Sequence, residues 1–445
     1  MALKALDILK LLPQKTGCRE CGQSTCLAFA MKVAQKQASI DECTYVSDEA
    51  KAALEGASAP PIRLVTIGEG ENKLQIGNET VMFRHEETFY HPPGIAGRVP
   101  DDLDAEALAA RVAAIGALKF VRVGMDIRVD VVAVDNVSGN ADRFQAAVKV
   151  ASKLDLPMVL IAEGASQMAA ALEVCADKRP LIHAARPDNW EEFAKLAKEK
   201  GCPLAVKAPD LEALAELTGK IKAAGVEDMV LDATADGLSA TLQTLTIIRR
   251  LALKKGARDL GYPCMAFAAG DDAFEEVAQA AMYVAKYAAI VVTSLSGAEQ
   301  ILPILTVRTN VYTDPRKPIQ VEPTLHEVGV PNPQSPVLIT TNFSLTYYTV
   351  EGEVEASRVP AYIGVIDTEG KSVLTAFASD KLTAEGVAAF LKSDAFKDKV
   401  SHKRVIIPGL VAVMSGALQD ESGWEVIVGP REASGIPKFL KTMWS

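Results

Sequence analysis

Four cysteines lie close together near the start of the sequence. Cys18, Cys21, Cys26 and Cys43 form the pattern C-x2-C-x4-C-x16-C. Four thiolates this close repel one another and need a cation, which can be a structural Zn2+ ion or an iron–sulfur cluster. Zinc sites commonly join two short C-x2-4-C pairs that are far apart in sequence, whereas here three ligands come from one loop. The spacing therefore favours a [4Fe–4S] cluster over zinc.

The residues around these cysteines also suit an anionic cluster. Gly17 and Gly22 leave backbone N–H groups accessible near the first two cysteines. Residues 27–38 predict a helix that Cys26 would start, so that the positive end of its dipole faces the cluster. The remaining cysteines occur singly and are expected to be small buried hydrophobic residues; they are Cys175, Cys202 and Cys264.

Length and composition limit the kinds of partner. The chain has 445 residues, of which 49% are hydrophobic and 23% charged, and two to four domains are expected. A net charge of −10 argues against nucleic acid or an anionic membrane as the main partner. We recognise no signal peptide and no transmembrane helix, so the sequence predicts a cytoplasmic protein.

The middle of the chain, residues 59–322, alternates short apolar runs with amphipathic segments. A predicted hairpin, RLVTIGEGENKLQIG, comes first. Eight strand-like runs follow: TVMFRH (80–85), VDVVAVD (129–135), PMVLIAE (157–163), PLIHAAR (180–186), PLAVKA (203–208), DMVLDAT (228–234), YPCMAFAAG (262–270) and AAIVVTSL (288–295). Eight such units predict a (β/α)8 TIM barrel, with a doubly wound open sheet as the alternative.

Polar residues occur where these strands are expected to end. They are Asp135, Asn136, Glu163, His183, Arg186, Lys207, Asp232, Thr293 and Ser294. Such residues either line an active site or only cap the loops. The sequence contains no HExxH, GxSxG or GxxxxGK[ST] motif, so it gives no sign of an autonomous hydrolase or nucleotidase.

A proline-rich passage at 323–336 marks a second predicted boundary and a plausible hinge. Beyond it four apolar runs, at 336–341, 361–370, 403–409 and 425–430, predict a small doubly wound sheet in a third domain, residues 323–445, after the cysteine domain (1–58) and the barrel. The loops after these strands are rich in Gly, Ser and Thr and carry little charge. They suit a large, flat, partly apolar ligand.

The cysteine loop, the barrel-like middle and the tail IIPGLVAVMSGALQDESGWEVIVGPREASGIPKFLK together resemble the large (gamma) subunits of corrinoid/iron–sulfur proteins of the anaerobic acetyl-CoA (Wood–Ljungdahl) pathway. The resemblance implies that Cys18, Cys21, Cys26 and Cys43 hold a [4Fe–4S] cluster. It also implies that a Rossmann-like C-terminal domain binds a base-off, cobalamin-type corrinoid. The implied corrinoid contacts are Thr340, Thr346, Gly370, Lys371, Ser372, Val373, Leu374, Thr375 and Ala433.

The function that this resemblance implies is methyl transport. The corrinoid cobalt, and no catalytic side chain, would accept a methyl group from methyltetrahydrofolate on a separate methyltransferase and pass it to CO dehydrogenase/acetyl-CoA synthase. The cluster would return Co(II) to Co(I), with a ferredoxin or reductive activator as electron source. A small subunit would complete a heterodimer.

The histidines are consistent with a corrinoid that has no protein imidazole on its cobalt. None of His85, His91, His183, His326 and His402 lies in a DxHxxG motif. Loss of that donor favours the electron-rich state of the metal. The hydroxyls of Ser372 and Thr375 would be weak neighbours of the lower face or only hold amide groups of the corrin. The alternative functions are a self-contained pterin-dependent methyltransferase and a cluster-based electron carrier.

Overall fold

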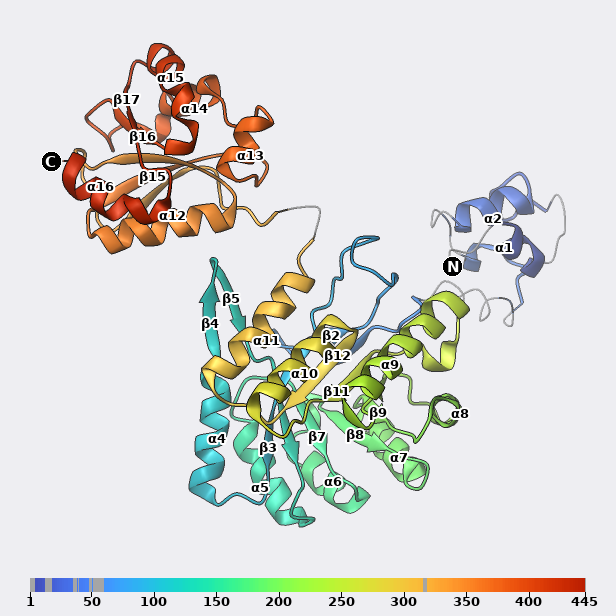
Figure 1. Cartoon of the computed structure of the whole chain (residues 1–445). Helices are drawn as coiled ribbons and strands as arrows, with labels where there is room; N and C mark the ends of the chain where they lie inside the picture. The colour runs from blue at the N-terminus through green and yellow to red at the C-terminus, as the bar shows by residue number, and fades with distance from the viewer. Residues whose placement is uncertain are drawn as a thin grey trace. The chain divides into compact units, whose positions relative to one another are not determined.

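The computed structural model describes residues 5–12, 18–34, 38, 40–47, 50, 60–314 and 318–444. Contacts divide the chain into two compact units (Figure 1). One unit comprises Met1–Phe120 and Arg128–Tyr312, and the other comprises Val121–Ile127 and Thr313–Ser445. The division into three domains stays a prediction.

The cysteine-containing segment forms short helices around a small apolar core. Helix α1 spans Ala5–Leu11, α2 spans Cys26–Ala34 and the 3-10 helix η1 spans Ile40–Glu42. Helix α2 begins at Cys26, as predicted, and the hydroxyl of Thr25 accepts a hydrogen bond from the Ala28 N–H at 3.1 Å. Ile8, Phe29, Cys43 and their neighbours are buried together.

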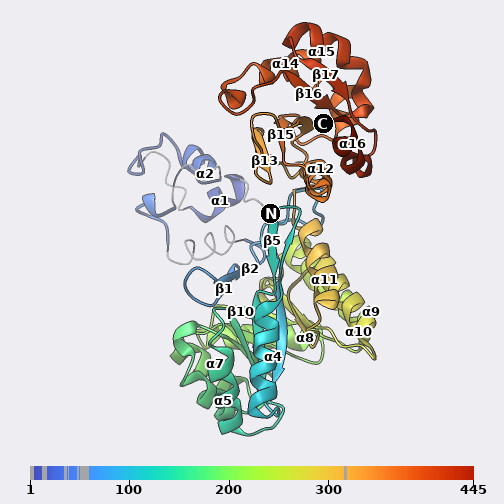
Figure 2. The same cartoon turned by 90° about the vertical axis from the view of Figure 1, so that its left-hand side faces the viewer.

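The middle of the chain is a closed barrel of eight parallel strands, so the barrel prediction is confirmed and the open sheet is wrong. Figure 2 shows this part of the chain from a second side. The strands are β3 (Gly94–Pro100), β6 (Val131–Asp135), β7 (Met158–Ile161), β8 (Leu181–Ala185), β9 (Leu204–Val206), β10 (Met229–Asp232), β11 (Cys264–Phe267) and β12 (Ala288–Thr293). Strand β12 pairs with β3 and closes the barrel.

Eight helices alternate with these strands: α4 (Ala105–Ala117), α5 (Ala141–Ala151), α6 (Ala165–Leu172), α7 (Trp190–Lys200), α8 (Leu211–Ala223), α9 (Gly237–Arg250), α10 (Ala273–Ala285) and α11 (Ala298–Val311). Several begin at side-chain caps. Asp104, Asn140, Asp210 and Asp272 each accept hydrogen bonds from the first turn of the helix that follows. The apolar faces of the helices then cover the barrel.

The first strand of the barrel was predicted in the wrong place. Residues 80–85 form bends and turns, and the strand is Gly94–Pro100, GIAGRVP, whose two glycines and flanking prolines weaken a strand pattern. Close packing explains why position 94 is a glycine. A Cβ at Gly94 would lie 2.6 Å from Cδ2 of Leu74 and 2.9 Å from Cγ2 of Val131. Only glycine fits this strand against its neighbours without displacement of those side chains.

The chain also forms two hairpins. The predicted one is confirmed as β1 (Val65–Ile67) and β2 (Leu74–Ile76), paired antiparallel. Its Val65, Ile67 and Ile76 belong to the same buried cluster as the barrel-interior residues. The second hairpin, β4 (Lys119–Arg122) and β5 (Met125–Arg128), was not predicted. No helix in the described residues is both long and apolar enough to cross a membrane.

The C-terminal unit is a five-stranded sheet in the order β13-β15-β14-β16-β17. Its strands are β13 (Leu325–Val328), β14 (Val337–Thr341), β15 (Ala361–Ile366), β16 (Arg404–Ile407) and β17 (Glu425–Val428). Its helices are α12 (Ser344–Ser357), α13 (Val373–Ala378), α14 (Ala384–Leu391), α15 (Ser415–Ser422) and α16 (Ile436–Met443). Two separate apolar clusters, one on each side of the sheet, show that both faces are covered.

Two predictions for this unit need correction. The four predicted strands are present and parallel, but β13 joins the edge antiparallel to β15, so the sheet is mixed and not a regular Rossmann sheet. Strand β13 also lies within the segment 323–336 that was predicted to be a hinge. Because four of its residues pair with β15, this segment belongs to the sheet, and the hinge prediction is wrong. The nearby prolines argue against a strand in the sequence, but a short edge strand tolerates them.

Candidate functional sites

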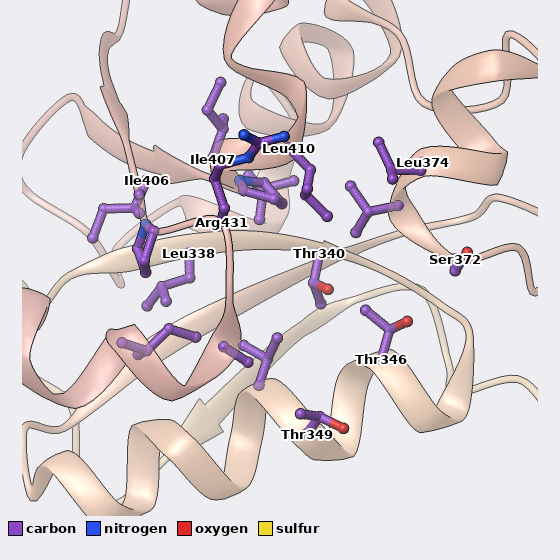
Figure 3. Close-up of a pocket in the computed structure, with 18 of the residues that line it drawn as sticks. Leu338, Thr340, Thr346, Thr349, Ser372, Leu374, Ile406, Ile407, Leu410 and Arg431 are labelled. Atoms are coloured by element: carbon purple, nitrogen blue, oxygen red, sulfur yellow. The ribbon is translucent and has the colours of Figure 1, made fainter.

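A cavity of about 430 Å3 lies in the C-terminal unit, beside the carboxyl ends of β14 and β16 (Figure 3). We call it the C-terminal cavity. Helix α12 lines it on one side, and the loops after β15, β16 and β17 line the rest. The lining residues are Leu338–Thr340, Phe343, Leu345, Thr346, Thr349, Val350, Ser372–Leu374, Ile406–Pro408, Leu410, Gly429–Arg431, Ala433 and Ile436. Ligands of open α/β sheets bind at this edge.

The chemistry of the lining suits a mostly apolar ligand that carries hydrogen-bonding groups. Leu345 and Leu374 are 56% and 53% exposed, which is unusual for leucines that face a cavity. Thr340 is 1% exposed, and its hydroxyl has no hydrogen-bond partner among the described residues. A buried hydroxyl without a partner costs free energy, so this group needs a ligand or a water molecule as its partner.

Most of the predicted corrinoid contacts surround this cavity. Six of the nine line it: Thr340, Thr346, Ser372, Val373, Leu374 and Ala433. The other three, Gly370, Lys371 and Thr375, lie in the same loop or in α13 but do not line it. Lys371 forms an ion pair with Glu369 at 3.6 Å, and the Thr375 hydroxyl lies 3.1 Å from that of Ser372.

Asn342 holds the loop after β15 in place, a role that was not predicted. Its side chain is buried, and its Oδ1 accepts hydrogen bonds at 3.0 Å from the N–H groups of Thr368 and Gly370 and from the Thr368 hydroxyl. Its Nδ2 donates to Gln320 at 3.2 Å and to Asp367 at 3.0 Å. Asn342 therefore fixes the turn that leads to Ser372.

Other lining residues were also missed. Thr349 and Val350 lie on the same face of α12 as the predicted contact Thr346, at helical spacing, a signal that a helix from 344 would have revealed. Arg431 is within a predicted loop but was not singled out. Among the described lining residues it alone carries a charge. None of the five histidines lines the cavity.

The four N-terminal cysteines lie in one neighbourhood. Cys18 is exposed, Cys21 and Cys26 are half-buried, and Cys43 is buried. Burial and the nearby thiols of Cys18, Cys43 and Cys21 raise the pKa of the Cys26 thiol. Within the described ranges, no three Cys, His, Asp or Glu side chains are arranged to hold a metal ion. The effect of the other three thiols on Cys26 indicates that the four are near neighbours. Their role as metal ligands stays a prediction. The three single cysteines are buried, as expected.

The polar residues at the carboxyl ends of the barrel strands mostly pair with one another. The carboxylate of Asp232 lies 3.0 Å from Nε2 of His183 and 3.1 Å from Nζ of Lys207. Burial raises the pKa of Asp232, but the hydrogen bond and charge of His183 and the charge of Lys207 outweigh it and hold the pKa well below its usual range.

Four further carboxylates are paired in the same way around the barrel. Glu276 accepts hydrogen bonds from the hydroxyls of Thr293 and Ser294, each at 2.6 Å. Asn136 donates to Asp101 at 2.6 Å, and Arg186 donates to Glu163 at 3.1 Å. Asp135 pairs with Arg98. This internal pairing supports the interpretation of these residues as loop caps.

Comparison with known proteins shows relatives along the full chain. The large subunit of the corrinoid/iron–sulfur protein of Moorella thermoacetica is 48% identical over 442 residues, which cover 99% of each chain. The chain belongs to the family of corrinoid/iron–sulfur protein large subunits. The gamma subunit of the acetyl-CoA decarbonylase/synthase complex of Methanothermobacter thermautotrophicus is 40% identical over the whole of both chains.

Two family models match separate parts of this family member. A model described as a putative Fe-S cluster matches residues 12–45. A model described as the CO dehydrogenase/acetyl-CoA synthase delta subunit matches residues 64–440. The full-length relatives are named large or gamma subunits, and their coverage of both chains decides which subunit this chain resembles. Dihydropteroate synthase from Thermus thermophilus has a TM-score of 0.40 and 16% identity over 56% of this chain and 100% of its own, a likeness too distant to bear on function.

Proposed function

We propose that this protein carries methyl groups on a corrinoid bound in the C-terminal cavity. A separate methyltransferase would supply the methyl group from methyltetrahydrofolate, and an acetyl-CoA synthase would receive it. When bound, the corrinoid supplies the cobalt that takes up and releases the methyl group, and an iron–sulfur cluster supplies the electron that restores oxidised cobalt. The observation that carries this proposal is the cavity, because six of the nine residues that the family resemblance implies as corrinoid contacts line it.

The lining residues fit a corrinoid in three respects. The Thr340 hydroxyl needs a hydrogen-bond partner, and the amide side chains of a corrin ring can provide one. The exposed Leu345 and Leu374 offer apolar contact to a flat macrocycle. The cavity is smaller than a whole corrinoid, so its apolar interior suits the detached nucleotide base, while the macrocycle would cover the mouth.

The absence of histidine from the lining supports a base-off corrinoid without a protein imidazole. His326 and His402, the two histidines of the C-terminal unit, lie 2.8 Å and 2.9 Å from the carbonyl oxygens of Glu322 and Ser335. Both are therefore engaged away from the cavity. The hydroxyls of Thr346, Thr349 and Ser372 would bind and orient the ligand without donating a nitrogen to its metal.

The N-terminal segment would hold a [4Fe–4S] cluster through Cys18, Cys21, Cys26 and Cys43. The match of residues 12–45 to an iron–sulfur model supports this proposal, as does the grouping of the four thiols. Iron–sulfur clusters bind thiolates, and the start of α2 at Cys26 would place the positive end of a helix dipole near the anionic cluster. A small subunit and a ferredoxin or reductive activator would be further partners in the cytoplasm.

Metal analysis of the anaerobically purified full chain, reconstituted with corrinoid and iron, tests this function. We expect about one cobalt and about four irons per chain. Cys26→Ser should lose iron and keep cobalt, because the two sites draw on different residues. The matched control is Cys175→Ser, since Cys175 is a buried cysteine outside the cluster. It should keep both metals.

Two outcomes would contradict the proposal. A chain that holds iron but no cobalt, even with its small subunit present, would instead be an electron carrier. A chain that turns over methyltetrahydrofolate without a partner enzyme would be a self-contained methyltransferase.

A further inference from the structure

We infer that Arg431 binds the phosphate of the nucleotide tail of the corrinoid, an inference that rests on the proposed function. Arg431 lies at the C-terminal cavity and is exposed. Its guanidinium forms no ion pair or hydrogen bond with any described residue. By contrast, Lys371 and Lys381, on neighbouring elements, both pair with Glu369. Arg431 is thus an available cation beside an otherwise uncharged lining.

The backbone of Arg431 is held at the cavity by close packing of two turns. The Gly409 N–H donates to the carbonyl of Pro430 at 3.1 Å, and the Gly429 N–H donates to that of Ile407 at 2.9 Å. A Cβ at Gly409 would lie 2.5 Å from the Gly429 oxygen and 2.9 Å from the Arg431 nitrogen. The turn after β17 therefore fits directly against the turn after β16, and this contact fixes the position of the Arg431 backbone.

The side chain lies on the opposite side of the cavity from the hydroxyls of α12. Figure 3 shows Arg431 across from Thr346 and Thr349, next to Leu410. A ligand in the cavity would therefore meet hydroxyls on one side and a guanidinium on the other. Only the guanidinium offers a charge.

A complete corrinoid has one anionic group that suits this position. A phosphodiester joins the macrocycle to the nucleotide base. If the base occupies the apolar interior and the macrocycle covers the mouth, the phosphate lies between them, at the level of the rim. Arginine recognises phosphate through two parallel N–H donors, a geometry that lysine does not offer. The apolar interior provides no other counter-charge for this phosphate.

Three probes separate recognition of the phosphate from recognition of the rest of the ligand. Cobalamin contains the base and the phosphate, cobinamide phosphate contains the phosphate alone, and cobinamide contains neither. Binding of each to the full-length chain is measured by quenching of tryptophan fluorescence. Arg431→Gln should weaken binding of the first two probes about three- to tenfold and leave cobinamide unchanged, because an exposed charge-assisted contact contributes modestly. Arg431→Lys should fall in between.

A matched control removes a cation from the same unit but away from the cavity. Lys441, in the last turn of α16, is exposed and does not line the cavity, so Lys441→Gln should bind all three probes like the wild type. Equal weakening of all three probes by Arg431→Gln would overturn the inference, and so would no weakening of any. If the wild type binds none of them, the proposed function itself fails, which is a different result.

Discussion

Polar side chains gather at the carboxyl ends of strands in both units of the chain. In the barrel, the carboxylate of Asp232 is paired with Nε2 of His183 and with Lys207, and Glu276 accepts from Thr293 and Ser294. Only Nδ1 of His183 is left, among the described residues of this cluster, as a buried atom without a partner. In the C-terminal unit, the buried hydroxyl of Thr340 has no partner among the residues that the structure describes. Leu345 and Leu374, which border the same cavity, are more than half exposed. The two regions share a topological position but differ in how fully their polar side chains are paired with other described residues.

The difference indicates how a ligand site can be distinguished from a loop cap. A polar cluster that is internally paired is stable without a ligand, because each buried group has its partner. A cavity with an unpaired hydroxyl and exposed apolar side chains becomes complete only when something binds. The C-terminal cavity is therefore the stronger candidate site, although both regions occupy the edge where ligands of α/β folds bind.

The largest effect should come from breaking the paired cluster of the barrel. Asp232→Ala removes the carboxylate that faces His183 and Lys207, and it should lower the free energy of unfolding by about 3–5 kcal/mol. Chemical denaturation measures the loss. Corrinoid binding to the C-terminal unit should be retained under native conditions. Glu216→Ala, which removes an exposed partner of Lys220, is the control and should change little. Comparable stability of the two variants would show that the cluster does not support the barrel.

A smaller effect is expected from obstruction of the C-terminal cavity. Ala433→Phe adds a ring to the lining and should weaken corrinoid binding about tenfold or more, since overfilling a packed site costs about 1–3 kcal/mol. The neighbouring Ser434 is exposed and does not line the cavity, so Ser434→Phe should leave binding unchanged. Titration with cobalamin, followed by absorption, compares the two. Undiminished binding by Ala433→Phe would place the ligand elsewhere.

Replacement of one threonine by valine in each unit sharpens the comparison further. Thr340→Val removes an unpaired hydroxyl, so the ligand-free chain should lose no stability, while corrinoid affinity should fall by about 0.5–1.5 kcal/mol, or roughly two- to tenfold. Thr293→Val removes one of the hydroxyl donors to Glu276 and should cost about 1 kcal/mol of stability with no effect on affinity. Thermal unfolding and corrinoid titration of both variants test this. If the two behave alike, the distinction between the regions fails.

The smallest expected effect concerns how the free energy of unfolding of the barrel depends on pH. Because the folded state depresses the pKa of Asp232, its contribution to stability is fully present above the usual pKa of an aspartate, about 4, and is lost as the pH falls through the depressed value. The difference in unfolding free energy between the wild type and Asp232→Asn should be constant from pH 7 to about pH 5 and shrink in stronger acid. A difference that grows on acidification would contradict the assigned direction.

Much of the fold could be predicted because its strands are continuous apolar runs. Seven of the eight barrel strands were found this way, as were the four parallel strands of the C-terminal sheet. Strand β3 was missed because its backbone must pass close to Leu74 and Val131, which requires glycine and hides the strand pattern. Strand β13 was missed because the prolines near it argue against a strand. A strand at the edge of a sheet tolerates prolines, whereas a strand in the interior does not.

The loops of the C-terminal cavity and six of its lining residues could be predicted, but the rest of the lining could not. Lys371 and Thr375 lie in the right segments, yet local hydrogen bonds and ion pairs turn them to other residues. Asn342 and Arg431 escaped notice for a different reason. Their importance depends on the approach of segments that are distant in sequence, such as the turn at 368–370 beside β14 and the turn at 408–409 beside 429–431.

The turn after β15 depends on the identity of single atoms in the amide of Asn342. Deamidation would replace its Nδ2 donor with an oxygen, which would face the carboxylate oxygen of Asp367 at the present donor distance of 3.0 Å. The resulting repulsion would act on the residue that holds the turn at Thr368 and Gly370. A change of one atom, with no residue lost, would then be enough to release the loop that borders the cavity.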